Sequence, residues 1–128
     1  MLNGITQEIL AHVPKLYETE KVPLRDKMIY LHFSIFDCHW WLAEYDGEDL
    51  FFGFAILNDD LINAEWGYTS LKELQSIKFN GRQIECDKHW KIRPAFQVEK
   101  IREASHWRPE RKDANNVIFL QPIEPEQL

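Results

Sequence analysis

The chain of 128 residues is the size of one domain, and 45% of its residues are hydrophobic, which is enough for an apolar core. Its formal net charge of -6 argues against general binding to nucleic acid, because neutralising phosphates needs a dominant positive field. The chain has only two cysteines and no signal-peptide pattern, which predicts a reduced, cytoplasmic protein. It has no apolar run of roughly 20 residues, so it is not expected to be inserted in a membrane.

The first predicted elements are a short helix and a β-strand. Apolar residues recur at helical spacing from Ile5 to Val13, behind a Thr6 that can cap a helix. The segment Lys27 to Phe36 alternates in the manner of a strand, so its odd-numbered residues are expected to face the core. These expected core residues are Ile29, Leu31, Phe33 and Ile35.

A hairpin is predicted next, between Trp40 and Leu57. In the first strand, strict alternation places Trp41, Ala43 and Tyr45 on one side of the sheet. Asp46-Gly47 supplies a turn, and the apolar run from Leu50 to Leu57 indicates a strand that is covered on both faces. Gly53, in the middle of this run, predicts a β-bulge or the close approach of another element.

A third antiparallel strand is expected at Leu61 to Tyr68, followed by a helix that Ser70 and Glu73 would cap. Asn80-Gly81 is interpreted as the end of that helix. Gln83 to Cys86 predicts a short edge strand. Together these patterns predict an α+β fold, an antiparallel β-meander of four or more strands with two or three helices packed on one face.

The residues that make up this hairpin and helix resemble the small bacterial domain-of-unknown-function 2958 family. The similar features are the aromatic strand before Glu44 and Asp46, Phe51-Phe52-Gly53, Gly67-Tyr68, Ser70-Leu71 with Glu73-Leu74, Leu16-Tyr17, and Ile84-Glu85 with Asp87. Cys86 departs from the basic residue that the family tends to carry there. The resemblance implies a single domain, 1–128, with a family-like core over 1–96 and a C-terminal extension over 97–128.

The family resemblance implies no catalytic residue. Its members occur largely on plasmids, phages and other mobile elements, so it implies an accessory role in the contest between mobile DNA and host defence. We therefore expect a non-enzymatic protein, without a cofactor, that binds and inhibits or modulates a host protein such as a restriction or CRISPR component. The candidate binding residues are acidic side chains at the two hairpin turns: Glu44, Asp46, Glu48, Asp49, Asp59 and Asp60.

Positive charge is concentrated in the segment 88–112, which has 8 Lys and Arg against 3 Asp and Glu. Arginine beside tryptophan suits either a protein interface or stacking on single-stranded nucleic acid. The plainer alternative is a loop whose tryptophans fill the core. The candidate residues for the two binding alternatives are Trp90, Arg93, Trp107, Arg108 and Arg111.

A last alternative is a small enzyme or metal site built from cysteine and histidine. Cys38-His39 and Cys86 with His89, with His32 nearby, offer ligand types that zinc prefers, and Cys86 with His89 could form a nucleophile and its base. However, Cys38 and His39 are neighbours in a strand, so their side chains point to opposite faces and cannot easily bind one ion. The negative charges of Glu85 and Asp87 would disfavour a thiolate at Cys86. Buried thiols and surface histidines are the competing interpretation, and we expect no metal.

Overall fold

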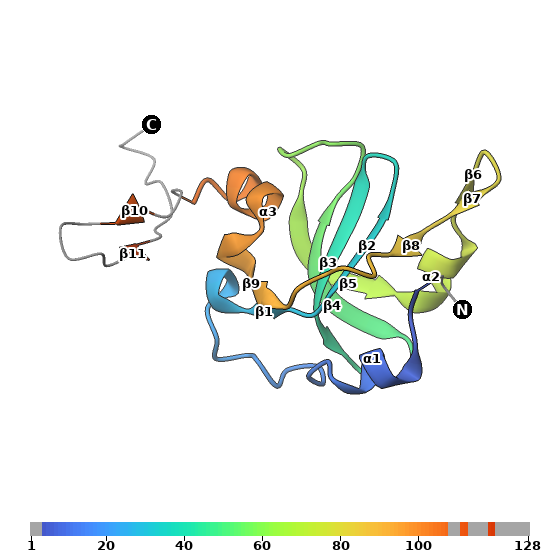
Figure 1. Ribbon diagram of the computed structural model, residues 1–128, viewed down its shortest axis with the longest axis horizontal. Helices are drawn as coiled ribbons and strands as arrows, with labels where there is room; N and C mark the ends of the chain where they lie inside the picture. Colours follow the sequence, from blue (N-terminus) through green and yellow to red (C-terminus); the bar gives the residue numbers. More distant parts are fainter. Residues whose placement is uncertain (1–3, 108–110, 113–117, 120–128) are drawn as a thin grey trace.

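Figure 1 shows the computed structural model, which describes residues 4–107, 111–112 and 118–119. Its helices are α1 (Gln7–Ala11), α2 (Leu71–Ser76) and α3 (Glu99–Ala104), with 3-10 helices η1 (Leu24–Asp26) and η2 (Ala95–Gln97). Its longer strands are β2 (Leu31–Ile35), β3 (Cys38–Tyr45), β4 (Leu50–Ile56) and β5 (Glu65–Ser70). Its two-residue strands are β1 (Met28–Ile29), β6 (Lys78–Phe79), β7 (Arg82–Gln83), β8 (Glu85–Cys86), β9 (Arg93–Pro94), β10 (Arg111–Lys112) and β11 (Ile118–Phe119).

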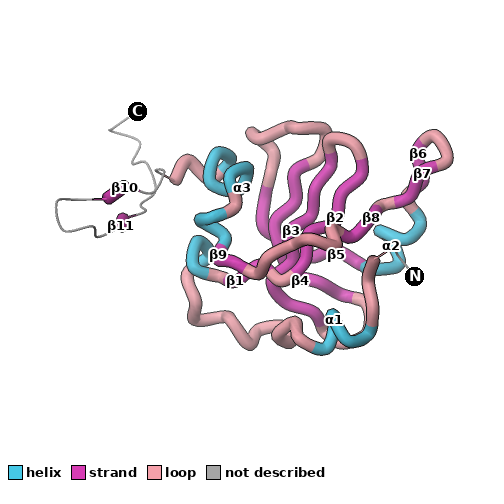
Figure 2. Tube along the Cα trace, in the orientation of Figure 1, coloured by secondary structure: helices cyan, strands magenta, loops and turns pink. Residues whose placement is uncertain are grey.

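The centre of the molecule is a five-stranded sheet with the order β5-β4-β3-β2-β8. Each pair of neighbouring strands is antiparallel, and β2 to β5 follow one another as a meander. Three further sheets have two strands each: β1 with β9, β6 with β7, and β10 with β11. Figure 2 shows β1–β9 and β6–β7 at two edges of the central sheet. The α+β class and the antiparallel meander are therefore confirmed.

Both faces of the sheet are covered, which explains the unbroken apolar run of β4. On one face, here called the α1–α2 face, Leu10 of α1 and Leu71 and Leu74 of α2 share a buried cluster with Phe33 and Phe51. Two helices thus pack on one face, as expected. The opposite or α3 face is covered by η2 and α3, whose buried residues pack against those of the sheet: Ala95, Val98 and Ile101 against Ile29, Trp41, Ala43, Phe54 and Ile56.

The strand predicted from Lys27 to Phe36 is interrupted at Tyr30. Leu31, Phe33 and Ile35 lie in the cluster of the α1–α2 face, but Ile29 lies in the cluster of the α3 face. The cause is a change of partner, because Ile29 of β1 pairs with β9 whereas Leu31 of β2 pairs with β3. The prediction that Ile29 shares a face with Leu31, Phe33 and Ile35 was therefore wrong.

A β-bulge in β3 changes the faces of its last residues. Leu42 pairs with Gly53, but Glu44 pairs with Phe52, so the extra residue Ala43 shifts the register. Tyr45 consequently lies on the α1–α2 face, away from Trp41 and Ala43. The predicted bulge or close approach at Gly53 is confirmed, since a Cβ atom there would lie 2.1 Å from the carbonyl oxygen of Trp41.

The Ser70 cap of α2 is confirmed, because the backbone N–H of Glu73 donates to Ser70 Oγ. The helix nevertheless ends at Ser76, and Asn80-Gly81 is the turn between β6 and β7. Both turn residues have positive φ, 50° and 78°, as a tight two-residue hairpin requires. The interpretation of Asn80-Gly81 as a helix end was wrong.

The segment expected as a C-terminal extension begins inside η2, and its part up to Trp107 packs on the α3 face through Val98, Ile101 and Ala104. The α-helices of the described residues have 5 or 6 residues each. None of them has the length and the apolar character that crossing a membrane requires.

Candidate functional site

The exposed ends of two hairpins meet in an aromatic–arginine surface, which we define as Phe36, Phe79 and Arg82. Phe36 lies in the β2–β3 turn, and Phe79 and Arg82 pair with each other across the β6–β7 hairpin. The rings of Phe36 and Phe79 meet edge to face with their centroids 5.2 Å apart, and the Arg82 guanidinium lies 5.7 Å from the centre of the Phe36 ring. Both rings are more than half exposed, 53% and 58%.

Phe36 has an unfavourable backbone conformation. Its φ of 49° lies in the left-handed region, which for a bulky side chain costs about 1–2 kcal/mol. Asparagine or glycine would adopt this φ more readily. Since the ring is also half in water, core packing does not account for a phenylalanine here.

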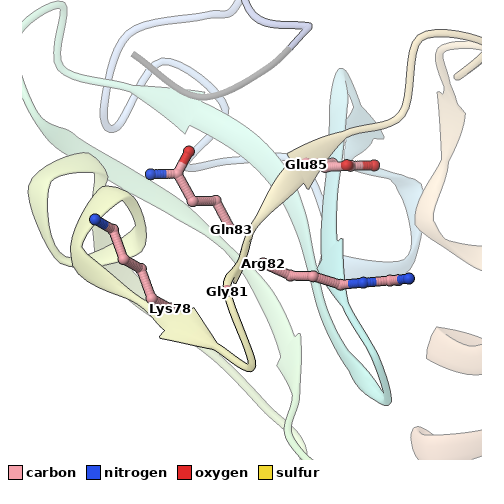
Figure 3. Close-up of a pocket in the computed structure, with 5 residues that line it drawn as sticks. All are labelled: Lys78, Gly81, Arg82, Gln83 and Glu85. Atoms are coloured by element: carbon pink, nitrogen blue, oxygen red, sulfur yellow. The ribbon is translucent and has the colours of Figure 1, made fainter.

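The β6–β7 hairpin also borders a shallow, open hollow of about 680 Å³, lined by Lys78, Gly81, Arg82, Gln83 and Glu85. Figure 3 shows that Lys78 and Gln83 extend to one side of the hairpin and Arg82 to the other. The side that carries Arg82 is also the side of Phe79, its cross-strand partner. Arg82 therefore lies on the same side of the hairpin as the Phe79 ring, whereas Lys78 lies on the opposite side.

The β4–β5 loop lies beside the β2–β3 turn, because the backbone N–H of Asp59 donates to the carbonyl oxygen of Asp37. This loop adds the exposed apolar side chains of Leu57 and Ile62 and the acidic residues Asp59 and Asp60. Lys100 of α3, 2.9 Å from Asp59, lowers the pKa of Asp59. Hydrogen bonds from Asn63 lower the pKa of Asp60. Both carboxylates are thus charged at neutral pH. We call Asp59 and Asp60 the acidic rim, because their loop borders the turn that carries Phe36.

The other acidic turn lies at the opposite end of the sheet. β3 has 8 residues, so the β3–β4 turn, with Asp46, Glu48 and Asp49, is roughly 25 Å from the β4–β5 loop. Asp46 accepts the N–H groups of its own turn, and Asp49 accepts from the Ser70 hydroxyl and from the N–H of Lys72. These bonds lower the pKa of both carboxyls. The acidic residues of the two turns therefore do not form one cluster.

Glu44 is not a surface residue at all. It is 4% exposed, and its carboxylate accepts hydrogen bonds from the backbone N–H groups of Tyr17 and Thr19, at 2.9 and 3.0 Å, and from the Thr19 hydroxyl. Lys27, also buried, places its Nζ 4.0 Å from the carboxylate. Glu44 thus fixes the loop after α1 to the sheet, and it is unavailable to a partner.

The tryptophans of the basic segment are held by the protein core. Trp90 and Trp107 are half-buried against the cluster of the α3 face, and the indole N–H of Trp90 donates to the Ile29 carbonyl oxygen at 2.9 Å. The Arg93 guanidinium lies 3.8 Å from the centre of the Trp90 ring. Arg108 lies outside the described residues, and of Arg111 only the backbone, in β10, is described. Trp90 is therefore partly covered by the protein's own side chains, and Trp107 is half-buried.

Two histidines, His32 and His39, lie against each other on the α3 face. His32 Nε2 lies 2.9 Å from His39 Nδ1, and His32 Nδ1 lies 3.5 Å from Asp87 Oδ2. Both rings stack on Trp41, with centroids 5.2 Å from it. Desolvation by burial is the largest effect on each ring and lowers the pKa of both.

The two cysteines differ in their surroundings. Burial, with the nearby Asp87 charge, raises the pKa of Cys86 to about 11, so its thiol is protonated at neutral pH. Cys38 is half-buried and accepts a hydrogen bond from the N–H of Asn58. Among the described residues, no three His, Cys, Asp or Glu side chains converge as metal ligands would.

No family model matches this chain, nor does any curated protein or solved structure. The resemblance to the domain-of-unknown-function 2958 family stays a prediction. The aromatic–arginine surface was not predicted from the sequence. Its signal was Asn80-Gly81, the strongest short-range hairpin signal, with Phe79 before it and Arg82 after it.

Proposed function

We propose that this chain is a non-enzymatic protein-binding module that docks on another protein through the aromatic–arginine surface. Phenylalanine and arginine are enriched at the centres of protein interfaces, where a few anchors provide most of the binding energy. The Phe36 and Phe79 rings, with Arg82 beside them, have this composition and are exposed in the described structure.

The observation that carries the proposal is Phe36 itself. A residue that is both strained and exposed reduces the stability of the isolated fold, and such residues concentrate at functional sites. Docking would bury the ring that folding leaves half in water. Such a contact would account for a phenylalanine at this strained and exposed position.

The acidic rim of Asp59 and Asp60 suggests the character of the partner. Charges at the edge of an interface steer association and select the partner more than they add affinity. A partner with an apolar depression for the two rings, a basic group opposite the acidic rim and an acidic group opposite Arg82 would complement this surface. If the family resemblance holds, this partner is a host defence protein whose basic surface handles nucleic acid, and the chain inhibits or modulates it.

The proposal is tested by affinity capture from a lysate of the native host, with the retained proteins identified by mass spectrometry. The wild-type chain is compared with the double variant Phe36→Asn, Phe79→Ser at low and high salt. We expect one stoichiometric partner on the wild-type chain, weakened by salt because of the acidic rim, and its loss from the double variant.

Tyr17→Asn is the matched control. Tyr17 is also exposed, 63%, and also has a left-handed φ, 70°, but it lies in the loop that Glu44 holds, away from the β2–β3 turn. This variant should retain the partner as the wild-type chain does. If the double variant retains the same partner equally well, or if Tyr17→Asn loses it too, the aromatic–arginine surface is not the docking site.

A further inference from the structure

A separate cavity lies between α1 and the segment that follows β8, away from the aromatic–arginine surface. Its volume is about 290 Å³. Ligand pockets in proteins start at roughly 300 Å³, so only a compact molecule would fit.

Most of the wall of this cavity is apolar. Ile9 of α1, Leu31 of β2 and Cys86 of β8 contribute to it, and aromatic rings come from Tyr30 and Trp90. Leu31 and Cys86 are buried members of the cluster on the α1–α2 face. The inner wall is therefore continuous with the packed core and is formed before any ligand arrives.

Trp90 is held in place by its own contacts. Its indole N–H donates to the Ile29 carbonyl oxygen at 2.9 Å, and the Arg93 guanidinium lies against its ring. The ring is also tilted against His32, with centroids 5.3 Å apart. A wall fixed in this way loses little conformational entropy when a ligand binds, which favours affinity.

Two adjacent residues of opposite charge, Asp87 and Lys88, also line the cavity. Asp87 Oδ1 accepts the N–H of His89 at 2.9 Å, and Asp87 Oδ2 lies 3.5 Å from His32 Nδ1. Burial lowers the pKa of His32, so this ring does not neutralise Asp87 at pH 7. Lys88 is exposed, and it takes part in none of the ion pairs within the described residues.

We propose that this cavity binds a free amino acid with an apolar side chain. The ligand's ammonium group donates to the Asp87 carboxylate, and its carboxylate accepts from the Lys88 ammonium. The apolar side chain lies against Ile9, Leu31 and Trp90. His12, which also lines the cavity, can donate a further hydrogen bond to the carboxylate. A ligand of this kind matches the two opposite charges and the apolar wall, and this site is independent of the proposed docking function.

Isothermal titration calorimetry at pH 7 tests the assignment. The probes are leucine, methionine and phenylalanine, each titrated to about 10 mM because a small ligand binds with limited energy per atom. We expect one-to-one binding of at least one of them. Its N-acetyl derivative lacks the ammonium charge and its amide lacks the carboxylate, so each should bind about tenfold more weakly or worse.

Three variants locate the binding site. Asp87→Asn keeps an acceptor for the N–H of His89 but removes the charge, and Lys88→Met keeps the aliphatic stem; each should weaken binding about tenfold or more. Ile9→Trp, at a position that is 36% exposed, should fill the cavity and abolish binding without loss of folding. Lys72→Met, on α2 and outside the cavity, is the matched control and should bind as the wild-type chain does.

The proposal fails if no probe binds at one-to-one stoichiometry. It also fails if the N-acetyl and amide derivatives bind as well as the free amino acid, since the cavity would then take an apolar group alone, such as a side chain of a partner protein. Unchanged binding by Asp87→Asn and Lys88→Met would likewise exclude the assigned contacts. Partner capture by the wild-type chain does not depend on these results, so this site and the docking function can fail separately.

Discussion

Gly53 and Gly67 lie directly opposite each other on β4 and β5, yet only one of them needs to be glycine. A Cβ atom at Gly53 would lie 2.1 Å from the Trp41 carbonyl oxygen, because the bulge of β3 pushes its backbone toward β4. A Cβ atom at Gly67 would meet nothing within 4 Å, and its φ is not positive. The same cross-strand pair thus contains one required and one replaceable glycine.

We expect Gly53→Ala to destabilise the fold by about 3 kcal/mol, as overpacking against backbone does. Gly67→Ala should stabilise it by about 0.5–1 kcal/mol, because alanine reduces the freedom of the unfolded chain and fits the strand. Urea unfolding of the two variants measures both signs. If both substitutions changed the free energy of unfolding equally, the backbone of β3 would not be too close to Gly53 for a Cβ atom.

The buried carboxylate of Glu44 gives the second expectation. Glu44→Ala removes the acceptor of the Tyr17 and Thr19 N–H groups and leaves the Lys27 ammonium buried without its counter-charge. The free energy of unfolding should fall by about 3 kcal/mol. Glu48→Ala, at an exposed position of the β3–β4 turn, is the control and should leave stability unchanged. A similar, small effect of both substitutions would contradict the structural role of Glu44.

A third expectation concerns Phe36 and separates stability from binding. Phe36→Asn relieves a left-handed strain of about 1–2 kcal/mol but loses the contact with Phe79, which is worth about 0.5–1.5 kcal/mol for an aromatic pair. The two effects nearly cancel, so thermal and urea unfolding should change by less than about 1 kcal/mol. A larger loss of stability would mean that Phe36 serves the fold, and the argument for a docking role would fall.

The sequence predicted the elements in which local chemistry and tertiary packing agree. Alternation identified Leu31, Phe33 and Ile35 as core residues, and the Ser70 hydroxyl identified the start of α2. Ile29 and Tyr45 were given the wrong neighbours for one reason. A strand pattern assumes an uninterrupted register. The break at Tyr30 depends on the pairing of β1 with the distant strand β9, and the bulge at Ala43 depends on how β3 pairs with β4.

The candidate site was less predictable, because its residues come together only in the folded chain. Phe36 and Phe79 lie in different hairpins, and no local pattern indicates that their rings touch. The acidic residues were hard to interpret for the opposite reason, because residues that are close in sequence have different roles in the structure. Glu44 is buried, whereas Asp49 accepts hydrogen bonds from the start of α2. Charge alone does not distinguish a solvated carboxylate from one that holds a loop.

The stacked histidines His32 and His39 make stability depend on pH. Their folded pKa values lie below the ordinary 6.5, chiefly because burial disfavours the charged ring. Asp87 and Arg93 act on His32, and Lys100, Asp59 and Asp37 act on His39. Well above pH 6.5 both rings are neutral in the folded and unfolded chains, so their full contribution is present. As the pH falls below 6.5 the unfolded chain takes up protons first, and stability is lost until the folded pKa values are reached.

Urea unfolding at intervals from pH 7.5 to pH 5 measures this dependence. Asp59 and Asp60 have lowered pKa values and act only near and below 3.8, so they do not contribute in this range. Replacing His39 with glutamine should flatten the pH dependence, because one of the two titrating rings is removed and the other loses its partner at 2.9 Å. Replacing the exposed His89 with glutamine should leave it unchanged. A flat profile for the wild-type chain would contradict the burial of the pair, since only a group whose pKa differs between the folded and unfolded states links protons to stability.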